Sequence, residues 1–174
     1  RLFALSFNSI IVSFIASISI ILIALFFLYV EKISKLKLNN IITNITSLGY
    51  VIPGAVIGLA FILLFTQFPL FNSHLLVGSF FVLIYAYVFR FLAVGKSPIK
   101  SSLEKQPKAL VDTSKVLGIN SFKALRTIHL PLNKMALVIA FILTFIDILK
   151  ELPITLILRP FNFDTLATQT YEFA

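Results

Sequence analysis

The feature that most constrains this sequence is an apolar run from Phe7 to Val30 that contains no charged residue. A helix of this length can cross the roughly 30 Å hydrocarbon core of a bilayer. Backbone polar groups in lipid must be satisfied within the segment, so the run is expected to form a transmembrane helix. Three later segments repeat the pattern, at Tyr50–Phe65, Leu75–Val94 and Leu132–Leu149. The sequence therefore predicts an all-α, polytopic transmembrane helix bundle with four spans.

Composition and charge agree with a membrane protein. Hydrophobic residues make up 59% and charged residues 13% of the chain, and the mean hydropathy is +1.00, whereas a soluble domain carries about 25% charged residues. The net charge is +8, and apart from Arg1, Lys150 and Arg159 the 15 lysines and arginines lie between Lys32 and Lys134. These basic residues fall in or beside segments that connect spans. Such a distribution is typical of cytoplasmic loops and argues against a nucleic-acid-binding surface.

Small and helix-breaking residues within the spans lead to two predictions about how the helices pack. Ser13 and Ser17 share one helix face, which favours close packing of helices in a membrane. The second span is interrupted by glycine and proline, and it is either a kinked packing helix or a segment beside a pathway. The interrupting residues are Gly49, Pro53, Gly54 and Gly58. Arg90, near the end of the third expected span, is expected to extend its side chain to the membrane interface.

The segment from Asp112 to Pro131 is polar and basic, unlike its surroundings. Its apolar spacing predicts two short helices, the first beginning at Pro107 and ending at Gly118. Asn120 or Ser121 can cap the second helix, and the proline at the end of the segment is expected to close it. A helix–glycine–helix elbow between two spans is a shape suited to contact with another protein.

A cluster of charges follows the fourth span. Asp147, Lys150 and Glu151 are spaced so that all three would share one helix face, and a charge at the centre of a span costs about 2.5–3.5 kcal/mol unless it is paired or faces an aqueous cavity. Asp147 could pair with Lys150, or Lys150 with Glu151, and Pro153 should break the helix. We assign a pathway or gate to these four residues and Arg159. The alternative is an interfacial helix end.

The elbow resembles the EAA loop of ABC-importer permeases, which couples the membrane subunit to the ATPase. That loop has Glu-Ala-Ala, three residues, Gly, nine residues, and then Ile-x-Leu-Pro. The matching positions in this sequence are Gly118, Ile128, Leu130 and Pro131, with Asp112, Thr113 and Ser114 in place of Glu-Ala-Ala.

Further segments are similar to ferric-iron permeases, in the second half of a fused two-half chain. They occur in the same order as in that family and extend the resemblance over about residues 7–174. The segments are GYVIPG (49–54), RFLAVG (90–95) and KELPITLILRPFNFDTLA (150–167). Permeases for thiamine, phosphonates or polyamines share much of this pattern.

The resemblance implies a type I ABC importer fold in a bacterial inner membrane, with multiple spans in the lipid bilayer. Residues 1–174 would form a single permease domain that lacks at least one span at each end, and 95–131 its cytoplasmic coupling loop. The implied partners are ABC ATPase subunits, an extracytoplasmic substrate-binding protein and a second permease half, fused or separate. The ATPase subunits would bind ATP, and this chain would hold no cofactor of its own.

The sequence offers no recognisable catalytic chemistry. It has no GxxxxGK[ST] phosphate-binding loop, and it has no cysteine to join His74 and His129 in a zinc site. His129 is expected to be a packing or interface residue. Two other classes of protein remain open: an ATP-independent transporter or channel with its ion site at Asp147, Lys150 and Glu151, and a structural assembly subunit.

Overall fold

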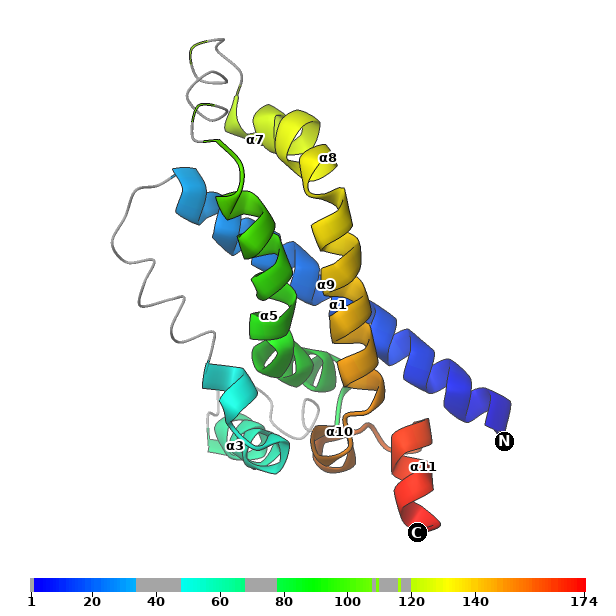
Figure 1. Ribbon diagram of the computed structural model, residues 1–174. Coiled ribbons are helices and arrows are strands. Elements are labelled where there is room, and N and C mark those ends of the chain that lie inside the picture. The colour runs from blue at the N-terminus through cyan, green and yellow to red at the C-terminus, as the bar shows by residue number, and fades with distance from the viewer. Residues whose placement is uncertain (1, 34–47, 68–77, 108, 110–115, 117–119) are drawn as a thin grey trace.

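A computed structural model describes residues 2–33, 48–67, 78–107, 109, 116 and 120–174 of this chain. In these ranges the regular elements are helices, as the sequence predicts (Figure 1). They are α1 (Leu2–Ile33), α3 (Gly54–Gln67), α5 (Phe80–Glu104), α7 (Ser121–Ala124), the π-helical turn η1 (Leu125–His129), α8 (Leu130–Leu132), α9 (Lys134–Leu149), α10 (Pro153–Leu158) and α11 (Leu166–Glu172).

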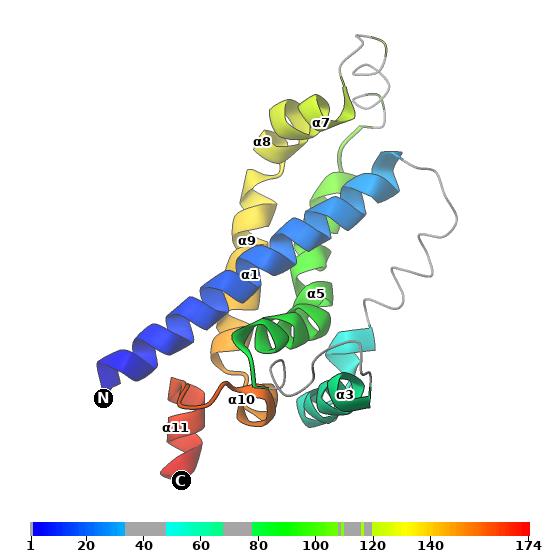
Figure 2. The same ribbon diagram turned by 180° about the vertical axis from the view of Figure 1, so that it is seen from behind.

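The long helices α1, α5 and α9 pack against one another and form the centre of the molecule (Figures 1 and 2). The contacts are close because α1 presents small residues to its neighbours. Ser13, Ala16 and Ser17 are each fully buried, which confirms the packing face expected from the serine spacing. Gly95 of α5 allows the same close approach, since a methyl group there would lie 2.5 Å from Ile20 Cγ2.

Of the described residues, α1 and α5 are long and apolar enough to span a membrane. A third span is present if α7–α8 and α9, which meet at an angle of 75°, count as one bent helix. The interruption that glycine and proline predicted in the second expected span, Tyr50–Phe65, is present. The helix is broken at Ile52 and Pro53, and α3 has only 14 residues, or about 21 Å of rise, which is less than the hydrocarbon thickness.

Helix α5 differs from the expected third span. It begins at Phe80, where the Ser79 side chain accepts a hydrogen bond from Val82 N, and it continues through Pro98 to Glu104 rather than ending near Val94. Residues 95–104 of the expected coupling loop are therefore a continuation of α5. Arg90 lies well inside this helix.

The described part of the elbow is one continuous helix, formed by α7, η1 and α8, with a π turn in its middle. Phe122 N donates to Asn120 Oδ1 at 3.4 Å, so Asn120 is the cap that the sequence offered. The helix ends at Leu132, one residue after the expected end at Pro131, and the chain bends at Asn133. The wider π turn of η1 ends at His129, two residues before Pro131, whose ring and missing N–H would disrupt a regular α-helix there.

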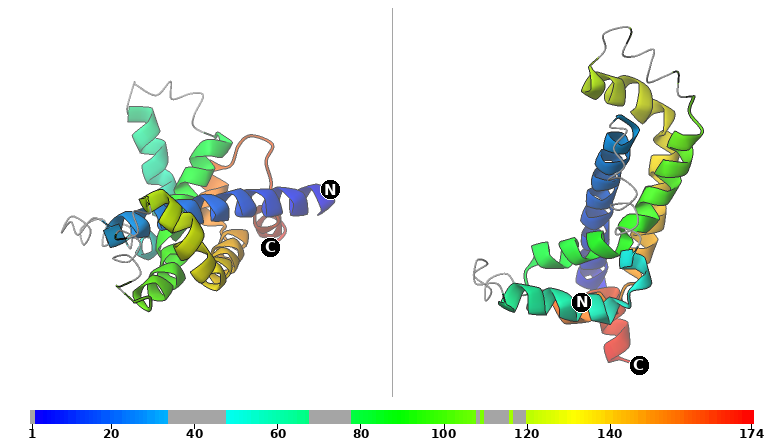
Figure 3. Two further views of the ribbon diagram at one scale, coloured as in Figure 1. Left: turned by 90° about the horizontal axis from the view of Figure 1, so that it is seen from above. Right: turned by 90° about the vertical axis from the view of Figure 1, so that its left-hand side faces the viewer.

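The short helices gather at the opposite end of the molecule from the elbow. Helices α3 and α10 lie side by side, and α11 contacts α1 (Figure 1). In the right-hand view of Figure 3, the yellow-green elbow is at the top and the red α11 is at the bottom. The packing of α3 on α10 depends on Gly58, since a methyl group there would lie 3.0 Å from two carbons of Ile157.

Candidate functional site

A buried ion pair joins α5 to the break between α9 and α10. Glu151 is only 8% exposed, and its Oε2 lies 3.3 Å from Nε of Arg90. Arg90 Nη1 also donates to the carbonyl oxygen of Ile52 at 2.7 Å. Ile52 directly precedes Pro53, where the second expected span is interrupted. One guanidinium group therefore holds two separate helix breaks against the middle of α5.

Local sequence explains why this pair can form. Pro153 occupies the first turn of α10, so Glu151 lies just before a helix N-terminus, where a carboxylate is favoured. Its Oε1 is 3.5 Å from Ile154 N. Gly54 leaves the necessary room, because a methyl group at this position would lie 2.5 Å from Glu151 Oε1 and 3.2 Å from Arg90 Nη1. A larger residue at Gly54 would displace one of the charges.

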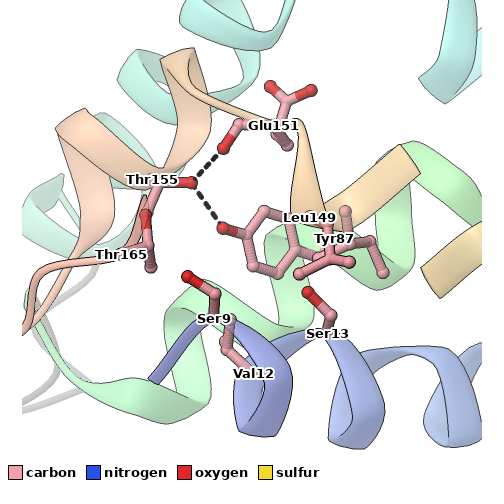
Figure 4. Close-up of a pocket in the computed structure, with 9 residues that line it drawn as sticks. Ser9, Val12, Ser13, Tyr87, Leu149, Glu151, Thr155 and Thr165 are labelled. Atoms are coloured by element: carbon pink, nitrogen blue, oxygen red, sulfur yellow. Dashed lines mark hydrogen bonds between the residues drawn. The ribbon is translucent and has the colours of Figure 1, made fainter. Parts of the chain in front are cut away.

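A chain of two hydroxyl groups starts at the backbone carbonyl of Glu151 (Figure 4). Thr155 Oγ1 donates to the Glu151 carbonyl at 2.5 Å, so the Tyr87 hydroxyl acts as the donor in its own 2.5 Å contact with Thr155 Oγ1. Ser9 and Ser13 of α1 reach toward the same cluster, and Leu166 N donates to Ser9 Oγ at 2.8 Å. The space among these side chains is too small to hold a water molecule. The cluster is therefore a closed polar core.

The structure separates the charges that were expected to share one face. Lys150 Nζ lies 3.3 Å from Asp147 Oδ1, which confirms one of the pairings considered, but the Lys150 side chain is 68% exposed. Glu151 is directed elsewhere because α9 ends at Leu149 and the chain turns before Pro153. The expected helix break is present. The expectation that all three charges lie on one helix face is wrong for Glu151.

Arg90 is the residue that sequence reasoning missed. The interpretation of its side chain as extending to the interface is wrong, because it is 17% exposed and directed to Glu151. One signal could have identified it. Arg90 is the one Lys or Arg within the apolar run Leu75–Val94, and a charge at membrane depth usually pairs with another.

Arg159, also assigned to the pathway, lies at the end of α10. It pairs with Asp164 and, at 3.2 Å, with Glu172 of α11. Asn8 of α1 donates to the Asp164 carbonyl at 3.0 Å. These contacts join α10, α11 and the first turns of α1. A role in the pathway for Arg159, Asp147, Lys150, Glu151 and Pro153 stays a prediction.

The elbow presents an exposed surface beyond the bundle. Phe122 is 71% exposed, and Lys123 and Arg126 beside it are also exposed. Ile128 and Leu130 are half-buried, whereas His129 is only 3% exposed and packs as expected. Four other assigned coupling residues lie outside the described residues: Asp112, Thr113, Ser114 and Gly118. The same holds for the first elbow helix, expected from Pro107 to Gly118, of which the structure describes residues 107, 109 and 116.

These helices define an integral membrane protein of the helical class. No protein-family model matches the chain. The chain is 28% identical over 165 residues to the Fe(3+)-transport system permease protein FbpB 2 of Haemophilus influenzae, which covers 95% of this chain and 32% of that protein. It is 33% identical over 102 residues to the putative ferric transport system permease protein FbpB 1 of the same organism. That match covers 59% of this chain and 16% of FbpB 1.

The chain is thus similar to ferric-iron transport permeases, which confirms the resemblance inferred from its sequence motifs. It spans about a third of the length of FbpB 2 and less of FbpB 1.

Proposed function

We propose that this chain is part of the transmembrane permease of an ATP-driven importer of ferric iron. The observation that carries the proposal is the similarity to an Fe(3+)-transport permease over 95% of the chain. Because the chain spans only 32% of that relative, the pathway would be completed by further permease segments, fused or separate. The protein would lie in a bacterial inner membrane as a multi-pass subunit.

The ATPase subunits would act on the permease at the elbow. ABC ATPase subunits would bind ATP and contact the exposed surface around Phe122, Lys123 and Arg126. Closure of these subunits would move the elbow, and the 75° bend into α9 would direct that movement into the bundle. Rigid-body rocking of this kind is a common switching mode.

Substrate would enter from the opposite end, delivered by an extracytoplasmic binding protein. The short helices α3 and α10 lie there, held by the pairing of Arg90 with Glu151. We therefore propose this ion pair as part of the outer gate. Ferric iron is favoured over thiamine, phosphonates or polyamines by the substrate named for both relatives.

An ATP-independent transporter is the less favoured alternative. Its ion site would need Asp147, Lys150 and Glu151 to converge, but Lys150 pairs with Asp147 and Glu151 pairs with Arg90. The three residues are therefore divided between two separate ion pairs.

Transport by the intact system tests the proposal. The full-length permease, its ATPase subunits and its binding protein would be reconstituted in vesicles, and accumulation of radioactive ferric iron would be measured. We expect accumulation to require ATP hydrolysis and to resist competition by thiamine, phosphonate or spermidine. Equal accumulation with a non-hydrolysable ATP analogue, driven by an ion gradient, would contradict it. The matched control is the same complex with a hydrolysis-deficient ATPase subunit.

A further inference from the structure

The base of the elbow contains a buried histidine that the proposed coupling does not yet explain. His129 ends the π turn η1 and is only 3% exposed. Its Nδ1 lies 3.0 Å from Oε1 of Gln106, just beyond the end of α5. Its ring makes an edge contact with Tyr29 of α1, with 5.8 Å between the ring centres. One side chain thus touches the ends of two long helices.

The backbone of the same residue forms the bend into the third long helix. The His129 carbonyl accepts a hydrogen bond from Asn133 Nδ2 at 2.6 Å and another from Asn133 N at 3.1 Å. Asn133 is 2% exposed and lies between α8 and α9, where the axis turns by 75°.

We propose that His129 is the positioning residue through which the elbow drives α1, α5 and α9 together. The inference rests on the proposed ATP-driven function and assigns a transmission role to a residue that is too buried to contact the ATPase itself. A purely apolar contact would permit the elbow to slide over the bundle. The hydrogen bond from the His129 ring to Gln106 is directional, so it resists that sliding, while the bonds from Asn133 to the carbonyl of the same residue fix the ring's position relative to α9. A π turn in a helix frequently marks a functional position.

Transport per ATP hydrolysed is the measurement that tests this inference. In the reconstituted complex, His129→Ala should lower the amount of iron moved per ATP by about fivefold, the factor that corresponds to one lost hydrogen bond. The ATPase subunits should still co-purify with the permease. His129→Asn keeps a donor near the Nδ1 position and should restore most of the ratio. Thr66→Val is the control, because among the described residues Thr66 hydrogen-bonds within α3, to Ile62 O at 2.8 Å and Leu63 O at 3.1 Å.

The outcomes separate this inference from the function on which it rests. Absence of ATP-dependent uptake by the wild-type complex would reject the proposed function itself. Coupled uptake by wild type with an unchanged ratio in an assembled His129→Ala complex would overturn only the role of His129. If His129→Ala fails to assemble, Gln106→Ala decides, because it removes one partner and leaves the buried ring in place. A normal ratio in Gln106→Ala would then overturn the inference.

Discussion

At the scale of single residues, the ion pair of Arg90 and Glu151 is expected to have the largest effect on the free energy of unfolding when one partner is changed. Both side chains are largely removed from solvent, at 17% and 8% exposed. A buried pair gains little over apolar residues of the same shape, but removing one partner leaves an uncompensated buried charge. The exposed pairing of Lys150 with Asp147 lacks this asymmetry, because water screens it.

A double-mutant cycle on this pair should therefore be strongly non-additive. We expect Arg90→Met or Glu151→Gln alone to destabilise the protein by about 3–5 kcal/mol, and the double variant to be more stable than either single variant. Thermal unfolding of the detergent-solubilised full-length permease, followed by circular dichroism, measures this. The matched control is Asp147→Asn with Lys150→Met, which should cost about 0–1 kcal/mol. Additive losses in the Arg90–Glu151 cycle would contradict the buried pair.

The residues also show what sequence could and could not predict of the candidate site. The pairing of Lys150 with Asp147 and the break at Pro153 depend on neighbours along the chain, so spacing was sufficient to find them. The contact between Arg90 and Glu151 joins α5 to a segment beyond α9. Helical periodicity describes one helix at a time and carries no information on how two helices are aligned.

At the scale of elements, the elbow and α3 depart most from expectation. Proline ordinarily ends a helix, and the elbow helix does end one residue after Pro131, at Leu132, but the sequence did not reveal the π turn of η1 before it. Hydropathy predicted a span at Tyr50–Phe65 and Pro53 indicated where it is interrupted, but neither showed that the helix after the break, α3, has only 14 residues. The bend is instead set at Asn133, through its bonds to the carbonyl of His129.

Asn133→Ala should make the angle between the elbow and the helix bundle more variable. The 2.6 Å side-chain bond to His129 O would be lost, and the bend would keep only its backbone bonds. The chain has no native cysteine, so spin labels at Lys123→Cys and Lys150→Cys report the angle as a distance distribution. We expect Asn133→Ala to broaden that distribution.

Thr144→Val is the control for this broadening. Thr144 makes a comparable bond, to Ala140 O at 2.8 Å, but within the straight part of α9. An unchanged distribution in Asn133→Ala, or equal broadening in Thr144→Val, would show that the side chain of Asn133 does not set the bend.

At the scale of the whole molecule, the long helices connect two differently built ends. The elbow lies beyond one end, and the short helices α3, α10 and α11 lie at the other (Figure 1). Helices α1, α5 and α9 pack closely along the bundle through small residues, so they are suited to move as a unit. In the proposed importer, ATP would act at the elbow and substrate would enter at the opposite end.

Cross-linking from the elbow to the ATPase subunit tests this account most directly. A cysteine in place of the exposed Lys123, introduced into the otherwise cysteine-free sequence, would be labelled with a thiol-reactive photo-cross-linker and illuminated in the assembled complex. The proposed function predicts a specific product with the ATPase subunit whose yield changes when ATP is added. A complex that is demonstrably intact and gives no product, here or from Phe122→Cys, would contradict coupling through the elbow.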